Sequence, residues 1–148
     1  MNRSIAQSEF VERIMQEHDG LREKVRRINT VLAQPEPSAD EIQNLLREFV
    51  TALVVHFSNE EDEGFFEEIK SHAPHLADRA GKLCVEHRHL LRDANELCRF
   101  ADAGSPSMLW WRELCSRCHE FSKRLTQHEH EESKLLQDSH QADICDFS

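Results

Sequence analysis

IQNLLREFVTALVVHFSNE, residues 42–60, is the stretch that decides the fold. Its apolar residues recur at alternating steps of three and four, the spacing of one face of an amphipathic helix. The same face ends in His56 and Glu60, which lie one helical turn apart where a packed helix would normally continue with apolar side chains. A glutamate inside a core is costly unless a positive charge meets it. The stretch therefore predicts a packed helix with a polar site inside it.

Three further runs have the same spacing, and each also places polar residues on its inward face. These exceptions are His18 in the first run, His87 in the third, and His128 with Glu132 in the fourth. We expect each run to be the buried side of one helix. The inward-facing residues of the four runs are Val11, Ile14, His18, Leu21, Val25, Ile28 and Leu32; Ile42, Leu46, Phe49, Leu53, His56 and Glu60; Leu76, Ala80, Leu83, His87, Leu90, Ala94, Leu97 and Ala101; and Leu114, Cys118, Phe121, Leu125, His128, Glu132 and Leu135.

Short breaks that contain proline separate the four runs. They are residues 34–37 (QPEP), 71–74 (SHAP) and 103–106 (AGSP). Ser38 followed by Glu41 is a capping-box pattern that starts the second helix. Because short connections force neighbouring helices to run antiparallel, the pattern predicts an all-α, up-down-up-down antiparallel four-helix bundle.

The predicted bundle occupies residues 1–136, and residues 137–148 are expected to form a polar, acidic C-terminal tail. A chain of 148 residues suits a single domain. The formal net charge of −10 makes nucleic acid and anionic membrane surfaces unexpected partners. No long apolar run follows Met1, so we expect neither a signal peptide nor a transmembrane span. Five cysteines, an odd number, favour a reducing compartment and a cytoplasmic location.

The polar exceptions of the four runs are predicted to meet at one depth. Counted from the end that holds the start of the first helix, each histidine lies roughly 10–14 residues in, or ~15–20 Å at 1.5 Å per residue. The two glutamates lie one turn nearer that end. Four imidazoles and two carboxylates that converge inside a bundle are expected to bind metal. The predicted metal ligands are His18, His56, Glu60, His87, His128 and Glu132.

The other histidines lie off the inward faces or near helix breaks, and we expect them to be solvated. The acidic runs at residues 60–63 and 129–132 are also expected to be mostly solvated. Only Glu60 and Glu132 share an inward face with a histidine.

The order of these residues resembles the hemerythrin-like (HHE cation-binding) domain family. That family shows His, then His-x-x-x-Glu, then His, then His-x-x-x-Glu, with one element per helix. The matching elements here are His18, HFSNE at residues 56–60, His87 and HEHEE at residues 128–132. The resemblance spans nearly the whole chain.

The resemblance implies a centre of two non-haem iron ions. By position, His18 and His56 would bind one iron. His87 and His128 would bind the other. The glutamates of the two His-x-x-x-Glu elements would bridge both ions, together with an oxo or hydroxo group. Each iron would keep a position open for a small molecule; zinc or manganese would fit the same ligands.

Two departures separate this chain from the oxygen-carrying hemerythrins. Those proteins have a second histidine one turn from the first on the third helix, whereas Leu83 and Leu91 flank His87 here. The last element of their ligand pattern is His-x-x-x-x-Asp, whereas the last element here is His128-x-x-x-Glu132. Both differences disfavour simple reversible oxygen carriage. They make the chain more similar to the bacterial iron-centre repair proteins and to the hemerythrin-like domain of an F-box iron sensor.

The function that the resemblance implies is binding of, or reaction with, O2, NO or peroxide, in sensing, scavenging or iron handling. The alternative is a protein-interaction module that is stapled by metal and whose stability reports iron or oxygen. An enzyme ranks last because no flanking acid–base pair can be named, so we assign no catalytic residue. The sequence identifies no protein partner.

Residues 115–119 read CSRCH, the string that attaches c-type haem. Haem is disfavoured because attachment follows export, because His119 points outward, and because haem would leave the two inward glutamates without counter-charge. We interpret Cys115 and Cys118 as packed helix residues, with a redox pair or accessory thiol as the alternative. At the start of the same helix, one ring of Trp110-Trp111 is expected to plug the end of the bundle, with dimer contact as the alternative.

Overall fold

The computed structural model describes residues 2–146, with side chains described for residues 9–139. Its elements are α1 (Asn2–Leu32), α2 (Ala39–Asp62), α3 (Phe65–His72), the 3-10 turn η1 (Pro74–Leu76), α4 (Ala77–Ala103) and α5 (Met108–Asp146). The residues described contain helices and no strand, so the predicted all-α fold is confirmed. In the same residues, we find no helix that combines the length and the apolar character needed to cross a membrane.

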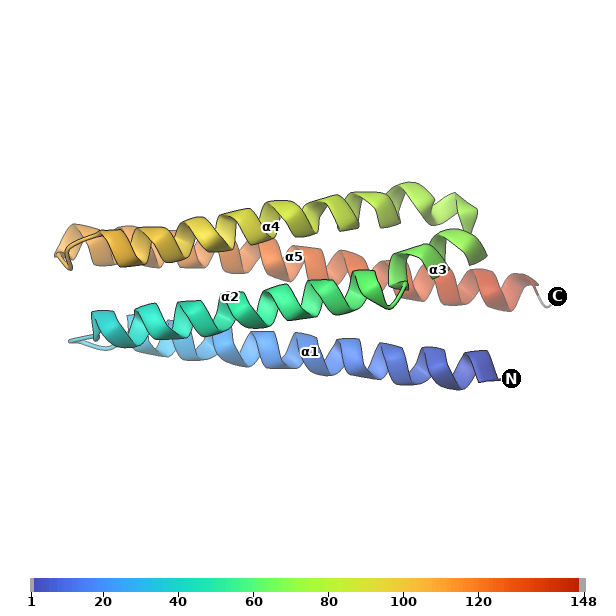
Figure 1. Cartoon of the computed structure of the whole chain (residues 1–148), viewed down its shortest axis with the longest axis horizontal. Coiled ribbons are helices and arrows are strands. Elements are labelled where there is room, and N and C mark those ends of the chain that lie inside the picture. The colour runs from blue at the N-terminus through green and yellow to red at the C-terminus, as the bar shows by residue number, and fades with distance from the viewer. Residues whose placement is uncertain (1, 147–148) are drawn as a thin grey trace.

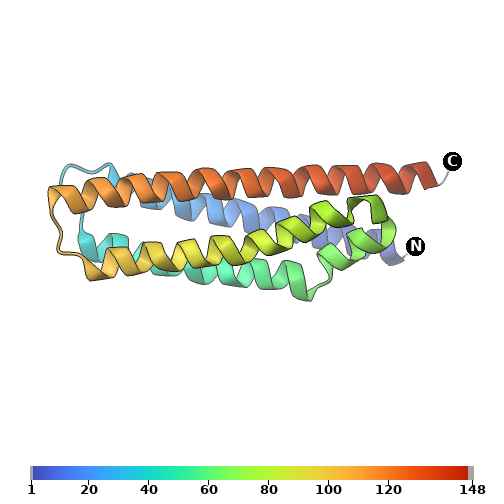
Figure 2. The ribbon, with the colours of Figure 1, turned by 90° about the horizontal axis from the view of Figure 1, so that it is seen from above.

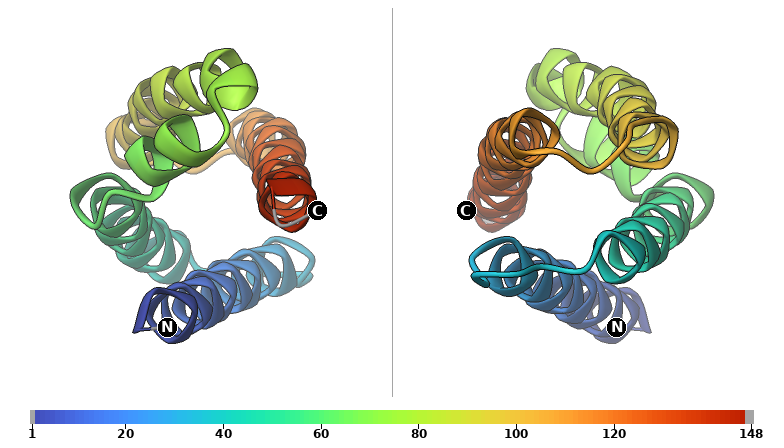
Figure 3. Two further views of the ribbon diagram at one scale, coloured as in Figure 1. Left: turned by 90° about the vertical axis from the view of Figure 1, so that its right-hand side faces the viewer. Right: turned by 90° about the vertical axis from the view of Figure 1, so that its left-hand side faces the viewer.

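Four long helices, α1, α2, α4 and α5, lie side by side along the length of the molecule (Figure 1). The start of α1 and the end of α5 lie at one end of the molecule, and the α1–α2 and α4–α5 connections lie at the other (Figures 1 and 2). Viewed along the long axis, the helices surround a common interior (Figure 3). In this ring α1 packs on α2, α2 on α4 and α4 on α5, while α5 packs more lightly on α1.

Serine side chains start two of these helices. The Ser38 hydroxyl accepts a hydrogen bond from the backbone N–H of Glu41 at 3.3 Å, which confirms the predicted cap of α2. The Ser107 hydroxyl does the same for the backbone N–H of Trp110 at 3.1 Å, at the start of α5. Each serine thus satisfies a backbone donor that the first helical turn leaves free.

The predicted second helix is interrupted at Gly64. This residue has φ 78°, in the left-handed region that favours glycine, and it separates α2 from α3. After the break, α3 packs against α2, α4 and α5 and buries Phe65, Phe66 and Ile69. One continuous helix, as the sequence predicted, would not have turned these apolar side chains over the interior.

Helix α5 continues from Met108 to Asp146. The helix therefore extends through most of the segment that was predicted as a polar, acidic tail. Residues 147–148 lie outside the part of the chain that is described. The division of the chain at residue 137 stays a prediction.

The predicted inward faces are buried, apart from Val11, Val25 and Leu32, which are half-buried. The buried apolar side chains form two clusters. The larger cluster lies toward the α1–α2 and α4–α5 connections and includes Phe49. The smaller cluster joins α3, η1, α4 and α5 and includes Leu135. On α4 and α5, the polar residues of the inward face fall between these clusters.

Trp110 closes the end of the larger cluster. Its side chain is 6 % exposed, and its indole N–H points to the Phe100 carbonyl oxygen at 3.4 Å. The Trp111 ring lies edge-on to it, with ring centroids 4.6 Å apart, and is half-buried. The predicted plug is confirmed, with Trp110 as the inward ring.

We predict that Gly104→Ala lowers the free energy of unfolding by about 1–3 kcal/mol, the usual cost of overpacking. A Cβ at Gly104 would lie 2.3 Å from Cδ1 and 2.4 Å from Nε1 of Trp110. Gly81→Ala is the control, because a Cβ there meets nothing within 4 Å, and it should stabilise the helix by about 0.5–1 kcal/mol. Urea unfolding measures both variants. If Gly104→Ala were as stable as the unmodified protein, the plug would not be tightly packed.

Candidate metal centre

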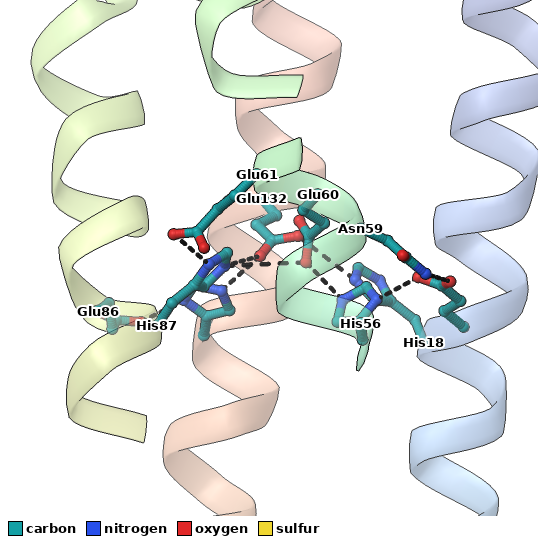
Figure 4. A network of polar contacts seen from close by, with 10 residues as sticks. His18, His56, Asn59, Glu60, Glu61, Glu86, His87 and Glu132 are labelled. Atoms are coloured by element: carbon teal, nitrogen blue, oxygen red, sulfur yellow. Dashed lines mark hydrogen bonds and ion pairs between the residues drawn. The ribbon is translucent and has the colours of Figure 1, made fainter. Parts of the chain in front are cut away.

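The six predicted ligands come together inside the bundle. Figure 4 shows His18, His56, Glu60, His87 and Glu132 pointing toward one another. Helices α1 and α4 supply one histidine each, and α2 and α5 each supply a histidine and a glutamate. Spacing of four residues puts His56 above Glu60 and His128 above Glu132 on one helix face. None of the six residues is more than 2 % exposed.

Glu132 is the centre of the cluster. Its Oε1 lies 2.5 Å from Nε2 of His128 and 3.4 Å from Nε2 of His87. Its Oε2 lies 3.4 Å from Nε2 of His18. Imidazoles from three helices, α1, α4 and α5, therefore converge on this carboxylate.

Glu60 lies to one side of the cluster. Its Oε1 is 2.6 Å from Nε2 of His56 and 3.9 Å from Nε2 of His87. The potential ligand atoms fall into two groups, with all atoms of a group within 4.8 Å of one another. The first group is His18, His56, Glu60 and Glu132, and the second is His87, His128 and Glu132. Only Glu132 belongs to both groups.

The donor atoms of the cluster fit a bound cation. Several of them are buried and have no hydrogen-bond partner among the described residues, although they lie close together. Buried polar atoms without partners are strongly unfavourable, and lone pairs that face one another need a cation between them. Imidazole nitrogen with carboxylate oxygen suits iron, zinc or manganese. The unpartnered atoms are Nε2 of His18, His56 and His128, Nδ1 of His18 and His87, both carboxylate oxygens of Glu60 and Oε2 of Glu132.

Glu60 and Glu132 ionise differently. Burial, together with the negative charge of Glu132, holds the pKa of Glu60 well above its usual range. Burial alone would raise the pKa of Glu132 as well, but the imidazoles of His128, His18 and His87 hold it well below the usual range. Without metal, Glu132 therefore favours its anionic form and Glu60 its protonated form.

Two carboxylates outside the cluster accept hydrogen bonds from the imidazole nitrogens that face away from it. Glu17 Oε1 accepts a hydrogen bond from Nδ1 of His56 at 2.7 Å, and Asn59 donates to the other Glu17 oxygen at 2.8 Å. Glu86 Oε1 accepts from Nδ1 of His128 at 2.7 Å. Each contact leaves Nε2 of that histidine directed at the cluster, where it can bind a metal.

The sequence pattern predicts no role for Glu17 or Glu86. One signal was present, because each directly precedes an inward histidine, in Glu17-His18 and Glu86-His87. Each glutamate bonds a histidine on the neighbouring helix rather than the one beside it in sequence. The contacts therefore depend on how the helices pack.

Aromatic side chains line the cluster. The Phe57 ring stacks on His87 at 3.9 Å between centroids and 10° between planes. The Phe66 ring of α3 meets the same imidazole nearly edge-on, at 5.4 Å and 64°. These rings surround His87 with apolar surface, which lowers the local dielectric and strengthens charge interactions.

The burial of Glu129 differs from the sequence prediction. We expected the run 129–132 to be solvated apart from Glu132, but Glu129 is only 4 % exposed. Burial raises the pKa of its carboxyl, while Arg22 from α1 lies 3.3 Å away and partly compensates. The packing of α1 against α5 explains this burial.

The remaining histidines and the cysteine motif lie outside the cluster. His75, His89, His119 and His130 are exposed as predicted, His72 is half-buried, and the His140 side chain is outside the described range. Cys118 is packed in the larger apolar cluster, and burial raises the pKa of its thiol to about 12. A thiol with this pKa is not a reactive thiolate at neutral pH, in agreement with its interpretation as a packed helix residue.

We predict that Glu60→Gln makes the metal-free protein more stable at alkaline pH and reduces its dependence on pH. A carboxyl whose folded pKa is raised contributes its full stability below the unfolded pKa, near 4.5, and loses it as the pH rises toward the folded pKa. Glutamine cannot ionise, so the variant lacks this loss.

Urea unfolding of the metal-free protein from about pH 5 to about pH 8 measures this effect. Glu120→Gln, at an exposed position of α5, is the matched control and should follow the unmodified protein. Parallel pH profiles for Glu60→Gln and the unmodified protein would show that Glu60 is not a buried, protonated carboxyl.

Comparison with known proteins supports metal binding. The family model of the hemerythrin HHE cation binding domain matches residues 3–67, less than half of the chain. The matched segment holds α1, α2 and the first residues of α3, with His18, His56 and Glu60. Neither the curated proteins nor the solved structures include a significant match to the chain. The predicted resemblance to the hemerythrin HHE cation-binding family is thus confirmed over residues 3–67, and metal binding is the function that this family indicates.

Proposed function

We propose that this chain is an up-down-up-down four-helix bundle that holds two non-haem iron ions and binds or reacts with O2, NO or peroxide. Its role would be sensing, scavenging or iron handling. The observation that supports this most directly is the set of buried, unpartnered imidazole and carboxylate atoms at one depth. The family match supports a metal, and the resemblance of the whole ligand pattern supports iron.

The proposed ligands divide between the two ions. His18 and His56 would hold one ion, and His87 and His128 the other. Glu132 lies within reach of both groups, which fits a bridging carboxylate. Glu60 would hold the first ion, since its Oε1 is 2.6 Å from Nε2 of His56 but 3.9 Å from Nε2 of His87. When bound, iron would supply reversible ligation and electron exchange toward small molecules.

The protein would control access and keep water from the centre. Phe57 and Phe66 pack against the His87 ring, and Leu83 is buried one turn away on the same helix face. The Glu61 carboxylate lies 3.6 Å from Nδ1 of His87. A groove of about 630 Å³ between α1 and α2 reaches Glu17 and His56. A diatomic molecule or a peroxide could approach the centre along this groove.

The same buried carboxylates favour a second function. In this function the chain would be a protein-interaction module whose stability depends on bound metal. Metal removal would leave them among unpartnered atoms in the core, so folding would depend on the metal. Met108 and Leu109 at the start of α5 are 73 % and 76 % exposed, which would give a partner an apolar contact.

We predict that protein loaded anaerobically with Fe(II) changes its absorption spectrum when NO, O2 or hydrogen peroxide is added. His56→Ala should bind less iron and respond less. His130→Ala is the matched control, because its side chain lies on α5 beside the centre but is exposed. An iron-loaded protein that responded to none of the three molecules would contradict the proposed reactivity.

We also predict that Glu17→Gln and Glu86→Gln each weaken metal binding by about 10–100-fold, the usual effect of removing an outer carboxylate partner. Both changes remove the charged acceptor that orients a histidine. Competition with a chromophoric chelator measures the affinity. Glu120→Gln should leave the affinity unchanged, and an equal affinity for all three variants would show that the outer carboxylates have no positioning role.

A further inference from the structure

The two groups of potential ligands are unequal. The first group offers four side chains, two imidazoles and two carboxylates. The second offers three, with Glu132 as its one carboxylate. Because a divalent cation gains from each further ligand, and because metal binding displaces the protons of its ligands, the first group should bind an ion more strongly.

The two groups are unequal because Glu60 lies on one side of the cluster. Its Oε1 lies 2.6 Å from Nε2 of His56, on the first side, and 3.9 Å from Nε2 of His87, on the second side. Glu132 offers one oxygen to each side, since its Oε1 lies 2.5 Å from Nε2 of His128 and its Oε2 lies 3.4 Å from Nε2 of His18. It therefore does not offset the inequality.

The hydrogen bonding of the potential ligand atoms also favours the first group. On the first side, Nε2 of His18, Nε2 of His56, both oxygens of Glu60 and Oε2 of Glu132 have no hydrogen-bond partner among the described residues. On the second side, Nε2 of His128 also has no partner in the described part of the chain, whereas Nε2 of His87 shares a hydrogen bond with Oε1 of Glu132 at 3.4 Å. A cation on the first side therefore satisfies more unpartnered buried atoms, whereas a cation on the second side must also replace an existing bond.

We propose that the two metal positions fill in a fixed order, with the position of His18, His56, Glu60 and Glu132 first and the position of His87 and His128 second. This inference rests on the proposed metal centre and adds its order of assembly. The form with one ion on the first side is then a defined state of the protein. When metal is scarce the chain is half-loaded, and only sufficient metal completes the pair.

Calorimetric titration of the metal-free protein with Fe(II) under anaerobic conditions tests this order. The unmodified protein should bind two ions in two steps whose affinities differ by about tenfold or more. His128→Ala should keep the tight step and lose the weak one. His56→Ala, which removes the matching histidine of the other His-x-x-x-Glu element, should lose the tight step.

A second measurement needs no substitution and so does not depend on the folding of a variant. With one equivalent of Zn(II), the imidazole ¹⁵N shifts of His18 and His56 should change, while those of His87 and His128 stay near their metal-free values. Equal changes in all four histidines, or a single step that takes up two ions, would overturn the order of filling while leaving the metal centre intact. Absence of metal binding in both experiments would instead overturn the proposed function itself.

Discussion

The burial of Glu132 among three imidazoles is the interaction on which the rest of the structure depends. A lone carboxylate in an apolar interior is very unfavourable, and this one is 0 % exposed. It is tolerated because His18, His87 and His128 approach it from three helices. Burial, together with the negative charge of Glu132, also raises the pKa of Glu60.

The fold isolates this polar layer. One apolar cluster lies on each side of it along the helices, so water is excluded from both directions. The smaller cluster exists because the chain breaks at Gly64 and turns α3 over the interior. The aromatic rings beside His87 then keep the site apolar where protein ligands are fewest. Exclusion of water strengthens every charge interaction in the layer.

Much of the fold, and of the cluster of six potential metal ligands, was predictable because both follow from the periodic spacing of residues along a helix. The alternating steps of three and four identified the inward faces, and the polar exceptions on them identified the six residues that the structure brings together. The break at Gly64 was missed because a glycine inside a helical pattern is often tolerated. The burial of Glu129, and the contacts of Glu17 and Glu86, depend on side chains of neighbouring helices, which no period along one helix records.

X-ray diffraction from crystals of the iron-loaded protein, recorded on both sides of the iron absorption edge, tests whether the buried imidazoles and carboxylates form a metal centre. If they do, anomalous density lies inside the bundle between the inward histidines, with Glu132 in contact with it. Well-ordered crystals with no anomalous density at this place, or with density only at surface histidines, would contradict the presence of a metal centre there.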